Sequence, residues 1–270
     1  MSDAPELYSK LYDKNIISDL RIKDETADNI YFGVKRSKYV VNIPKSPTTE
    51  IAYLAGAIAG DGCFHIINSK DRNFPRVKIT ITSGDKTYLN LLNSMFIRNF
   101  DVGGKIFRDK RKNSCYDLHI NHRVIWLYFR NVLGLNKSSL SVPSEFTNPT
   151  LFRFFLAGFF DTDGYLNNRG IFGVMMSGKN SGFLSQLTIY SKDFYGLDFS
   201  PVKTTTLKVN PREFERSYTR LRKNHTQKFL SIVPLLNKKY EWARRESNPR
   251  SSLFSLHTPQ MEGVDVRATS

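Results

Sequence analysis

Two aspartates occupy the eighth position in two copies of the same nine-residue pattern. The first copy is LAGAIAGDG, from Leu54 to Gly62, and the second is LAGFFDTDG, from Leu156 to Gly164. Each copy follows an apolar lead-in and contains no proline, so each predicts a short buried helix that ends near its aspartate, Asp61 or Asp163. The two aspartates stand 163 − 61 = 102 residues apart.

Carboxylates at the carboxyl ends of two helices predict a cation site. The last carbonyls of a helix lack partners within it, and that end carries partial negative charge. Adding Asp61 and Asp163 there is unfavourable unless a cation lies between them. Every ligand is then a hard oxygen, so we expect Mg²⁺, with Mn²⁺ able to substitute, rather than Zn²⁺ or copper. The alternative is a pair of helix-end carboxylates exposed to water.

Small residues predict how the two helices are arranged. Gly56 and Gly60 lie four residues apart on one face of the first helix, and Gly158 and Thr162 offer the matching face of the second. We expect the two helices to pack against each other with their backbones close together. We also expect the glycine after each aspartate to end its helix in the left-handed conformation.

A lysine follows each aspartate at nearly the same distance. The sequence Leu-Asn-Lys occurs at 135–137 and again at 236–238, so Lys137 lies 137 − 61 = 76 residues and Lys238 lies 238 − 163 = 75 residues after its aspartate. The shared offset and context place one lysine near each aspartate. Lys239 is an alternative to Lys238, because the alignment can slip by one residue. The other interpretation is a solvated lysine that binds carbonyls at a helix end.

The elements after the first motif form a regular series. The alternation of residues 77–82 predicts a strand that buries one face and presents the other, with Val77, Ile79 and Ile81 inward and Lys78, Thr80 and Thr82 outward. The remaining predicted elements of the first half are strands at 63–67, 105–109 and 115–120 and helices at 85–97 and 122–133. The order is helix, two strands, helix, two strands, helix.

The second half repeats this order. Its predicted elements include helices at 181–194 and 225–236 and strands near 202–209 and 213–222. The fold class is therefore α+β, with two pseudo-symmetric αββαββα halves. We divide the chain into an N-terminal extension, two halves and a disordered tail rich in Ser, Pro, Arg and Thr, at 1–47, 48–145, 146–245 and 246–270. The extension has no counterpart in the second half, and both an extra DNA-contacting arm and a partly ordered tail remain open.

The charge of the chain predicts a polyanionic partner. Its 270 residues include 40 Lys and Arg against 25 Asp and Glu, a formal net charge of +15, which favours a nucleic acid partner over a merely basic soluble protein. Strands that present basic side chains to one side suit the major groove of double-stranded DNA, although each single residue is equally well explained as a solvated charge. The candidate DNA contacts are Lys70, Arg72, Arg76, Lys78, Arg108, Lys110, Arg111, Lys112, Lys203, Lys208, Arg212, Arg216 and Arg220.

Cysteine usage and hydropathy predict the compartment. Cys63 and Cys115 form neither a zinc pattern nor a CxxC pair, so we expect no structural disulfide and a reducing intracellular compartment. The cytoplasm and an organelle such as a mitochondrion or chloroplast both fit. The N-terminus is polar, and the apolar runs at 51–60 and 154–160 are too short to span a bilayer, so we expect no signal peptide and no membrane partner.

The two nonapeptides also carry a family resemblance. They match the LAGLIDADG motif at their Leu-Ala-Gly and Asp-Gly ends, so residues 48–245 resemble the single-chain, two-motif LAGLIDADG homing endonucleases. The resemblance implies a saddle-shaped pair of αββαββα halves, each with a four-stranded antiparallel DNA-binding sheet and with the motif helices at the interface. It also implies that Asp61 and Asp163 bind the catalytic metals, and that Lys137 and Lys238 lie near the scissile phosphates.

The function implied by the resemblance is site-specific, Mg²⁺-dependent cleavage of both DNA strands at a long asymmetric target by a monomer. Two metals held by two carboxylates would activate water and neutralise the charge that develops on the phosphate. One alternative is an RNA-splicing maturase that binds intron RNA. Another is a non-cleaving DNA-binding protein, against which both retained acids argue. The start at Met1 and the absence of a His-Asn splice junction predict an intron-encoded or free-standing protein rather than an intein.

Overall fold

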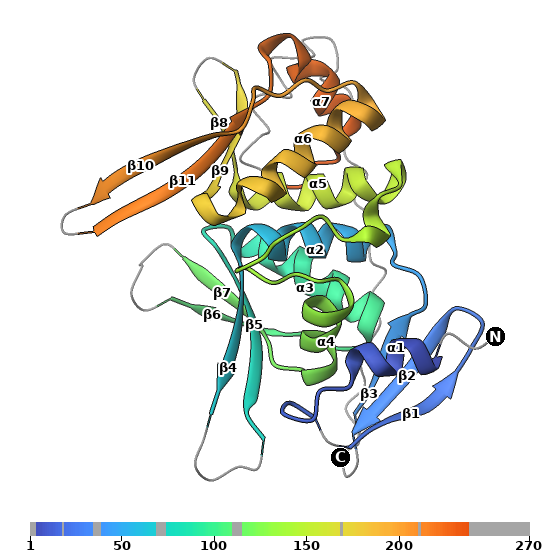
Figure 1. Cartoon of the computed structure of the whole chain (residues 1–270). Helices are drawn as coiled ribbons and strands as arrows, with labels where there is room; N and C mark the ends of the chain where they lie inside the picture. The colour runs from blue at the N-terminus through green and yellow to red at the C-terminus, as the bar shows by residue number, and fades with distance from the viewer. Residues whose placement is uncertain are drawn as a thin grey trace. The chain divides into compact units, whose positions relative to one another are not determined.

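Two versions of one helix-and-strand unit follow each other along the chain, and a smaller segment precedes them (Figure 1). The chain is represented by a computed structural model. The residues that it describes are 4–17, 19–34, 39–68, 74–109, 115–167, 170–209 and 212–237.

The first half begins with α2, the helix of the first motif. Its elements are α2 (Thr49–Asp61), β4 (Gly62–Ile67), β5 (Arg76–Ser83), α3 (Lys86–Phe100), β6 (Lys105–Arg108), β7 (Tyr116–Ile120) and α4 (Arg123–Leu127). The four strands form one antiparallel sheet in the order β4-β5-β7-β6. As the alternation predicts, Val77, Ile79 and Ile81 are buried on the covered face, but Thr80 on the other face is buried as well.

The second half begins with α5, the helix of the second motif. Its elements are α5 (Pro149–Asp163), β8 (Gly164–Leu166), β9 (Phe172–Ser177), α6 (Ser181–Tyr195), β10 (Lys203–Val209), β11 (Arg212–Arg220) and α7 (Thr226–Ile232). The sheet order β10-β11-β9-β8 is antiparallel and is that of the first half read from the opposite edge. The predicted α+β fold with two αββαββα halves is therefore confirmed.

Two helices differ from their predictions. The helix expected at 122–133 consists of α4 followed by one π-helical turn, Tyr128–Val132. The helix expected at 225–236 ends earlier, at Ile232, because Pro234 holds the preceding residue in an extended conformation. Within the described ranges, no helix has both the length and the hydropathy required to cross a membrane.

The N-terminal segment is a helix and a sheet. It contains α1 (Ala4–Leu11) and the antiparallel sheet β1-β2-β3, formed by Leu20–Glu25, Asn29–Val34 and Val40–Pro44. Apolar side chains on β2 and β3 are fully buried, so a partly ordered tail does not describe these residues. The alternative of a DNA-contacting arm stays a prediction, and the tail expected at 246–270 lies outside the described residues.

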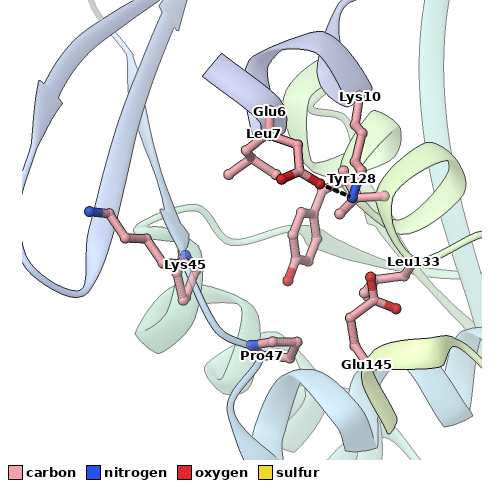
Figure 2. A pocket seen from close by; sticks show the side chains of 10 residues that line it. Glu6, Leu7, Lys10, Lys45, Pro47, Tyr128, Leu133 and Glu145 are labelled. Atoms are coloured by element: carbon pink, nitrogen blue, oxygen red, sulfur yellow. Dashed lines mark ion pairs between the residues drawn. The ribbon is translucent and has the colours of Figure 1, made fainter. Parts of the chain in front are cut away.

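Helix α1 lies beside the π-helical turn of the first half. Figure 2 shows the pocket between them, lined by Glu6 and Lys10 of α1, by Tyr128 of the π-helical turn, and by Glu145. Glu6 and Lys10 form an ion pair at 2.9 Å across one turn of α1. The N-terminal segment thus packs against the part of the first half that leads to Lys137.

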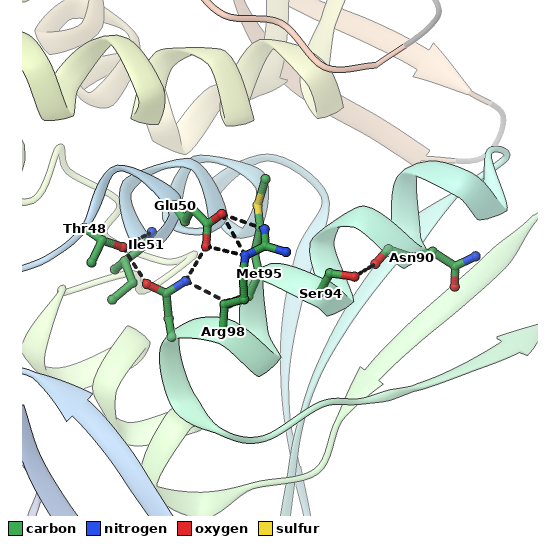
Figure 3. A network of polar contacts seen from close by, with 8 residues as sticks. Thr48, Glu50, Ile51, Asn90, Ser94, Met95 and Arg98 are labelled. Atoms are coloured by element: carbon green, nitrogen blue, oxygen red, sulfur yellow. Dashed lines mark hydrogen bonds and ion pairs between the residues drawn. The ribbon is translucent and has the colours of Figure 1, made fainter. Parts of the chain in front are cut away.

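Hydrogen bonds fix the start of α2 to the end of α3. The backbone N–H of Ile51 donates to the side chain of Thr48 at 3.1 Å, so Thr48 caps the amino end of α2. Glu50 accepts from Arg98 at 2.6 Å and from Asn99 at 2.7 Å (Figure 3), and Asn99 also accepts from Thr48 at 2.6 Å. These bonds hold the first motif helix in place at its amino end.

Acid should unfold this protein in part through His122, which immediately precedes α4. Burial, aided by the charge of Arg123, lowers the pKa of His122 from 6.5 to about 4. Because the unfolded chain binds this proton more tightly than the folded chain, stability is lost as the pH falls from 6.5 to about 4. We expect this residue to lower the free energy of unfolding by about 3 kcal/mol over that interval. Urea unfolding at each pH would measure it, and an equal pH dependence in His122→Gln would contradict it.

Candidate active site and nucleic-acid interface

The two motif helices lie side by side with their backbones in contact (Figure 1). A Cβ added to Gly56 would overlap the carbonyl oxygen of Phe155, and a Cβ added to Gly158 would overlap that of Tyr53. The contact is reciprocal, because 158 − 56 and 155 − 53 both equal 102. A Cβ on Gly60 would likewise overlap the side chain of Thr162. The predicted close packing of the two helices through their small residues, which we call the glycine seam, is therefore confirmed.

The motif aspartates are the last residues of α2 and α5. Gly62 and Gly164 were expected in the left-handed conformation, but they are extended, with φ of −71° and −73°. The reason is that each helix passes directly into a strand, β4 or β8. Glycine is still required at position 62, because a Cβ there would lie 2.5 Å from the carbonyl oxygen of Ile58.

The carboxyl ends of the two helices meet. A Cβ on Gly60 would lie 3.4 Å from the backbone nitrogen of Asp163, so the last turn of α2 touches the end of α5. Asp61 is exposed and Asp163 is half-buried, while most of each helix behind them is buried. The arrangement brings both carboxylate-bearing ends to one place that solvent can reach.

Lys137 lies at this meeting point. Its Nζ donates to the carbonyl oxygen of Ala59 at 2.6 Å and also to that of Gly60. Burial lowers the pKa of Lys137, and the negative charges of Asp163 and Asp61 act in the opposite direction. The lysine binds helix-end carbonyls, as one interpretation expected, but they belong to the motif helix rather than to its own. It is a half-buried cation beside both motif aspartates.

Asp161, the other acid of the second motif, has a different environment. It is almost fully buried and accepts from the hydroxyl of Tyr53 at 2.5 Å and from the backbone N–H of Leu236 at 2.6 Å. The hydroxyl oxygens of Tyr53 and Tyr88 are also hydrogen-bonded to each other at 3.3 Å, and burial raises the pKa of each tyrosine well above its usual value. Asp161 thus joins α5 to α2 and to the segment after α7.

In the second half, Lys238 was the predicted counterpart of Lys137, with Lys239 as its alternative. Lys238 and Lys239 both lie outside the described residues. The described residue before them, Asn237, donates from its side-chain amide to the carbonyl oxygen of Asp161 at 3.0 Å. The sequence pattern did not indicate a role for this asparagine.

The uncovered face of the first sheet carries polar and basic side chains. By strand register Lys78 lies opposite His65, and Thr82 lies opposite Asp117 and donates to it at 2.6 Å. Arg76 shares this face with Lys78, whereas Arg108 pairs with Tyr116 on the other face. The remaining first-half candidates lie outside the described residues, namely Lys70, Arg72, Lys110, Arg111 and Lys112.

Histidines on the same face were not among the predicted contacts. The ring of His119 packs against that of Phe107 in a tilted arrangement, with ring centroids 4.9 Å apart. Burial, followed by the charge of Lys78, lowers the pKa of both His65 and His119, so both are neutral donors and acceptors near pH 7. The alternation of β4 and β7 could have placed them on this face from the sequence.

The second sheet presents basic residues on one face in the same way. By register Lys203, Arg216 and Arg220 share a face. Arg220 donates to the hydroxyl of Tyr165 at 3.2 Å and lies over the ring of Tyr218, 5.4 Å from its centre. The remaining two second-half candidates, Lys208 and Arg212, lie in β10 and β11. The face therefore offers an arginine whose position is already fixed by two tyrosines.

Comparison with known proteins identifies the fold. Neither a protein-family model nor a curated protein matches the sequence. A solved structure of mesophilic variants of the homing endonuclease I-DmoI matches with a TM-score of 0.54 and 17% identity, covering 73% of this chain and 97% of that chain. I-DmoI in complex with DNA and manganese matches with a TM-score of 0.51 and 18% identity, covering 68% and 96%. The chain has the fold of the LAGLIDADG homing endonucleases.

Proposed function

We propose that this protein is a site-specific DNA endonuclease that hydrolyses both strands of a long, asymmetric target with the help of Mg²⁺. The observation that carries the proposal is the meeting of two acidic helix ends beside the half-buried Lys137. The fold supports it, because the solved structures with this fold include a homing endonuclease in complex with DNA and manganese.

The residues present fit Mg²⁺ or Mn²⁺ as the catalytic cation. Among the described residues, no group of three or more His, Cys, Asp or Glu side chains could hold a metal ion. Asp61 and Asp163 would be the protein ligands. Two carboxylates suit Mg²⁺, which is commonly bound by one or two carboxylates together with water and substrate phosphates. When bound, such cations lower the pKa of water and offset the negative charge of the transition state.

The residues of the chain perform the remaining tasks. Water adds to the phosphorus atom and loses a proton, while the P–O bond to one sugar oxygen breaks and that oxygen gains a proton. Lys137, held against the carbonyls of Ala59 and Gly60, keeps a positive charge near the phosphate as its negative charge grows. The site needs no reorganisation to provide that charge, because the lysine is already fixed in place.

The two sheets support the proposed DNA recognition. Lys78 and Arg76 on the first sheet and Lys203, Arg216 and Arg220 on the second provide phosphate and base-edge donors. The two faces differ in side chains, so the chain as a monomer would read an asymmetric sequence. Both cysteines are free, which fits the reducing compartment that we propose for an intron-encoded or free-standing protein.

Cleavage of a DNA library with randomised sequence would test the proposed function. With Mg²⁺ or Mn²⁺ we expect one long sequence to be cut in both strands. With Ca²⁺ we expect binding without cleavage, because its looser coordination positions water poorly. Full cleavage in EDTA would refute the metal site. The absence of any cut sequence, together with binding of intron RNA, would favour a splicing maturase instead.

A further inference from the structure

The segments that follow the last helix of each half can be compared residue by residue. The repeated letters Leu-Asn-Lys would align Leu135 with Leu236, but Leu135 is 1% exposed and Leu236 is 42% exposed. Leu235, at 2% exposed, matches Leu135 instead. Two residues further along, this alignment pairs Lys137 with Asn237.

The hydrogen bonds give the same alignment. Lys137 donates from Nζ to the carbonyl oxygen of Ala59 at 2.6 Å, and Asn237 donates from Nδ2 to that of Asp161 at 3.0 Å. Ala59 and Asp161 are equivalent positions of the two motifs, because 161 − 59 = 102, the spacing of the two motif aspartates. Each side chain therefore binds the same carbonyl of its own motif helix.

We propose that the two active sites are unequal, with a lysine beside one and a neutral amide in its place at the other, and that the two DNA strands are therefore cut in a fixed order. The inference rests on the proposed endonuclease function. Asn237 can replace the hydrogen bond that Lys137 makes to the helix carbonyl. It brings no positive charge to the phosphate, and charge-assisted donors are the stronger ones.

The difference should be large enough to observe directly. Loss of one preorganised donor at a developing negative charge costs roughly 10²–10³ in rate in well-studied enzymes. Each half keeps its motif aspartate, so we attribute the difference to this one donor and expect the two strands to be cut at rates that differ by at least about tenfold. A nicked intermediate should then accumulate, always with the same strand cut.

The experiment uses the full chain and the target sequence selected from the library. A supercoiled plasmid shows the nicked intermediate, and a duplex labelled on each strand gives the two rates. The ratio of these rates is measured within one complex, so it does not depend on the fraction of folded protein. Asn237→Lys should accelerate the slow strand, and Lys137→Asn should slow the fast strand, so both should move the ratio toward one.

A matched control tests whether a lysine acts only at position 237 or whether any added positive charge nearby has the same effect. Leu236→Lys adds a positive charge at the neighbouring, exposed position and should leave the ratio unchanged. If Asn237→Lys fails to fold, Lys137→Asn alone decides the matter. Equal strand rates in the unchanged protein, or a ratio that neither variant moves, would overturn the inference while leaving the endonuclease function intact. Absence of cleavage at every sequence would instead refute the proposed function itself.

Discussion

Asp61→Asn and Asp163→Asn should each abolish double-strand cleavage while the protein still binds its DNA. An amide carries no negative charge, so it binds a hard cation far more weakly than a carboxylate. We expect a loss of at least about a thousandfold in the rate of linear product formation, the upper end of the effect of a single electrostatic group. A time course on supercoiled plasmid with Mg²⁺ measures cleavage, and a gel shift with Ca²⁺ measures binding.

Asp161→Asn is the matched control, because it makes the same carboxylate-to-amide change two residues from Asp163. Its carboxylate is buried against Tyr53 and the backbone of Leu236. We expect this variant to retain substantial cleavage but to lose about 1–3 kcal/mol of stability, since a buried hydrogen-bonding partner is changed. Asp61→Asn and Asp163→Asn should instead lose cleavage and keep their stability. If Asp161→Asn is inactive and Asp163→Asn is active, the assignment of the active site is wrong.

The repeated motif was sufficient to predict the centre of the fold. Gly56 and Gly158 occupy equivalent positions in two apolar helices, and such helices with small residues on one face have few other ways to pack. The structure places each glycine against the backbone of the opposite helix. Alternation of period two was similarly sufficient for β5, where three apolar residues face the core.

Local irregularities limited the rest of the prediction. An Asp-Gly pair at a helix end fits either a left-handed cap or an immediate strand, and only the sheet decides between them. In the N-terminal segment, β1 has a register shift between Ile22 and Asp24 that interrupts its alternation. The sheet β1-β2-β3 was missed for that reason, although Ile30 and Phe32 of β2 do alternate with more exposed neighbours.

Long-range polar contacts left no signal in the sequence. Tyr53 and Asp161 are separated by 108 residues, and neither has neighbours that suggest a pair. The alignment of Lys137 with Asn237 that we propose depends on the burial of Leu235 rather than Leu236, which could not be known before the end of α7 was located.

Gly158→Ala should cost about 3 kcal/mol of unfolding free energy or more, although it adds a single methyl group. The new Cβ would overlap the carbonyl oxygen of Tyr53 and lie 2.9 Å from the backbone nitrogen of Ala57. These atoms belong to the backbone of α2, so no side-chain rotation can make room. The helices must separate, and their acidic ends move with them, so cleavage should fall together with stability.

Gly182→Ala is the control for this effect, because it makes the same change within helix α6. A Cβ at Gly182 would meet no atom within 4 Å. Alanine is the better helix former, so this variant should gain up to about 1 kcal/mol. Urea unfolding of both variants at one temperature gives the comparison. A loss below about 0.5 kcal/mol for Gly158→Ala would show that the two helices are not in backbone contact.

The reciprocal geometry of the seam makes a sharper expectation possible for the double variant. Gly56→Ala should cost about as much as Gly158→Ala, because its Cβ would overlap the carbonyl oxygen of Phe155 in the same way. Once one methyl group has forced the helices apart, the second methyl group overlaps the opposite backbone less and therefore costs less free energy of unfolding. The double variant should therefore lose clearly less stability than the sum of the single losses, as expected for coupled sites. Additive losses would mean that each glycine contact yields locally, without separation of α2 from α5.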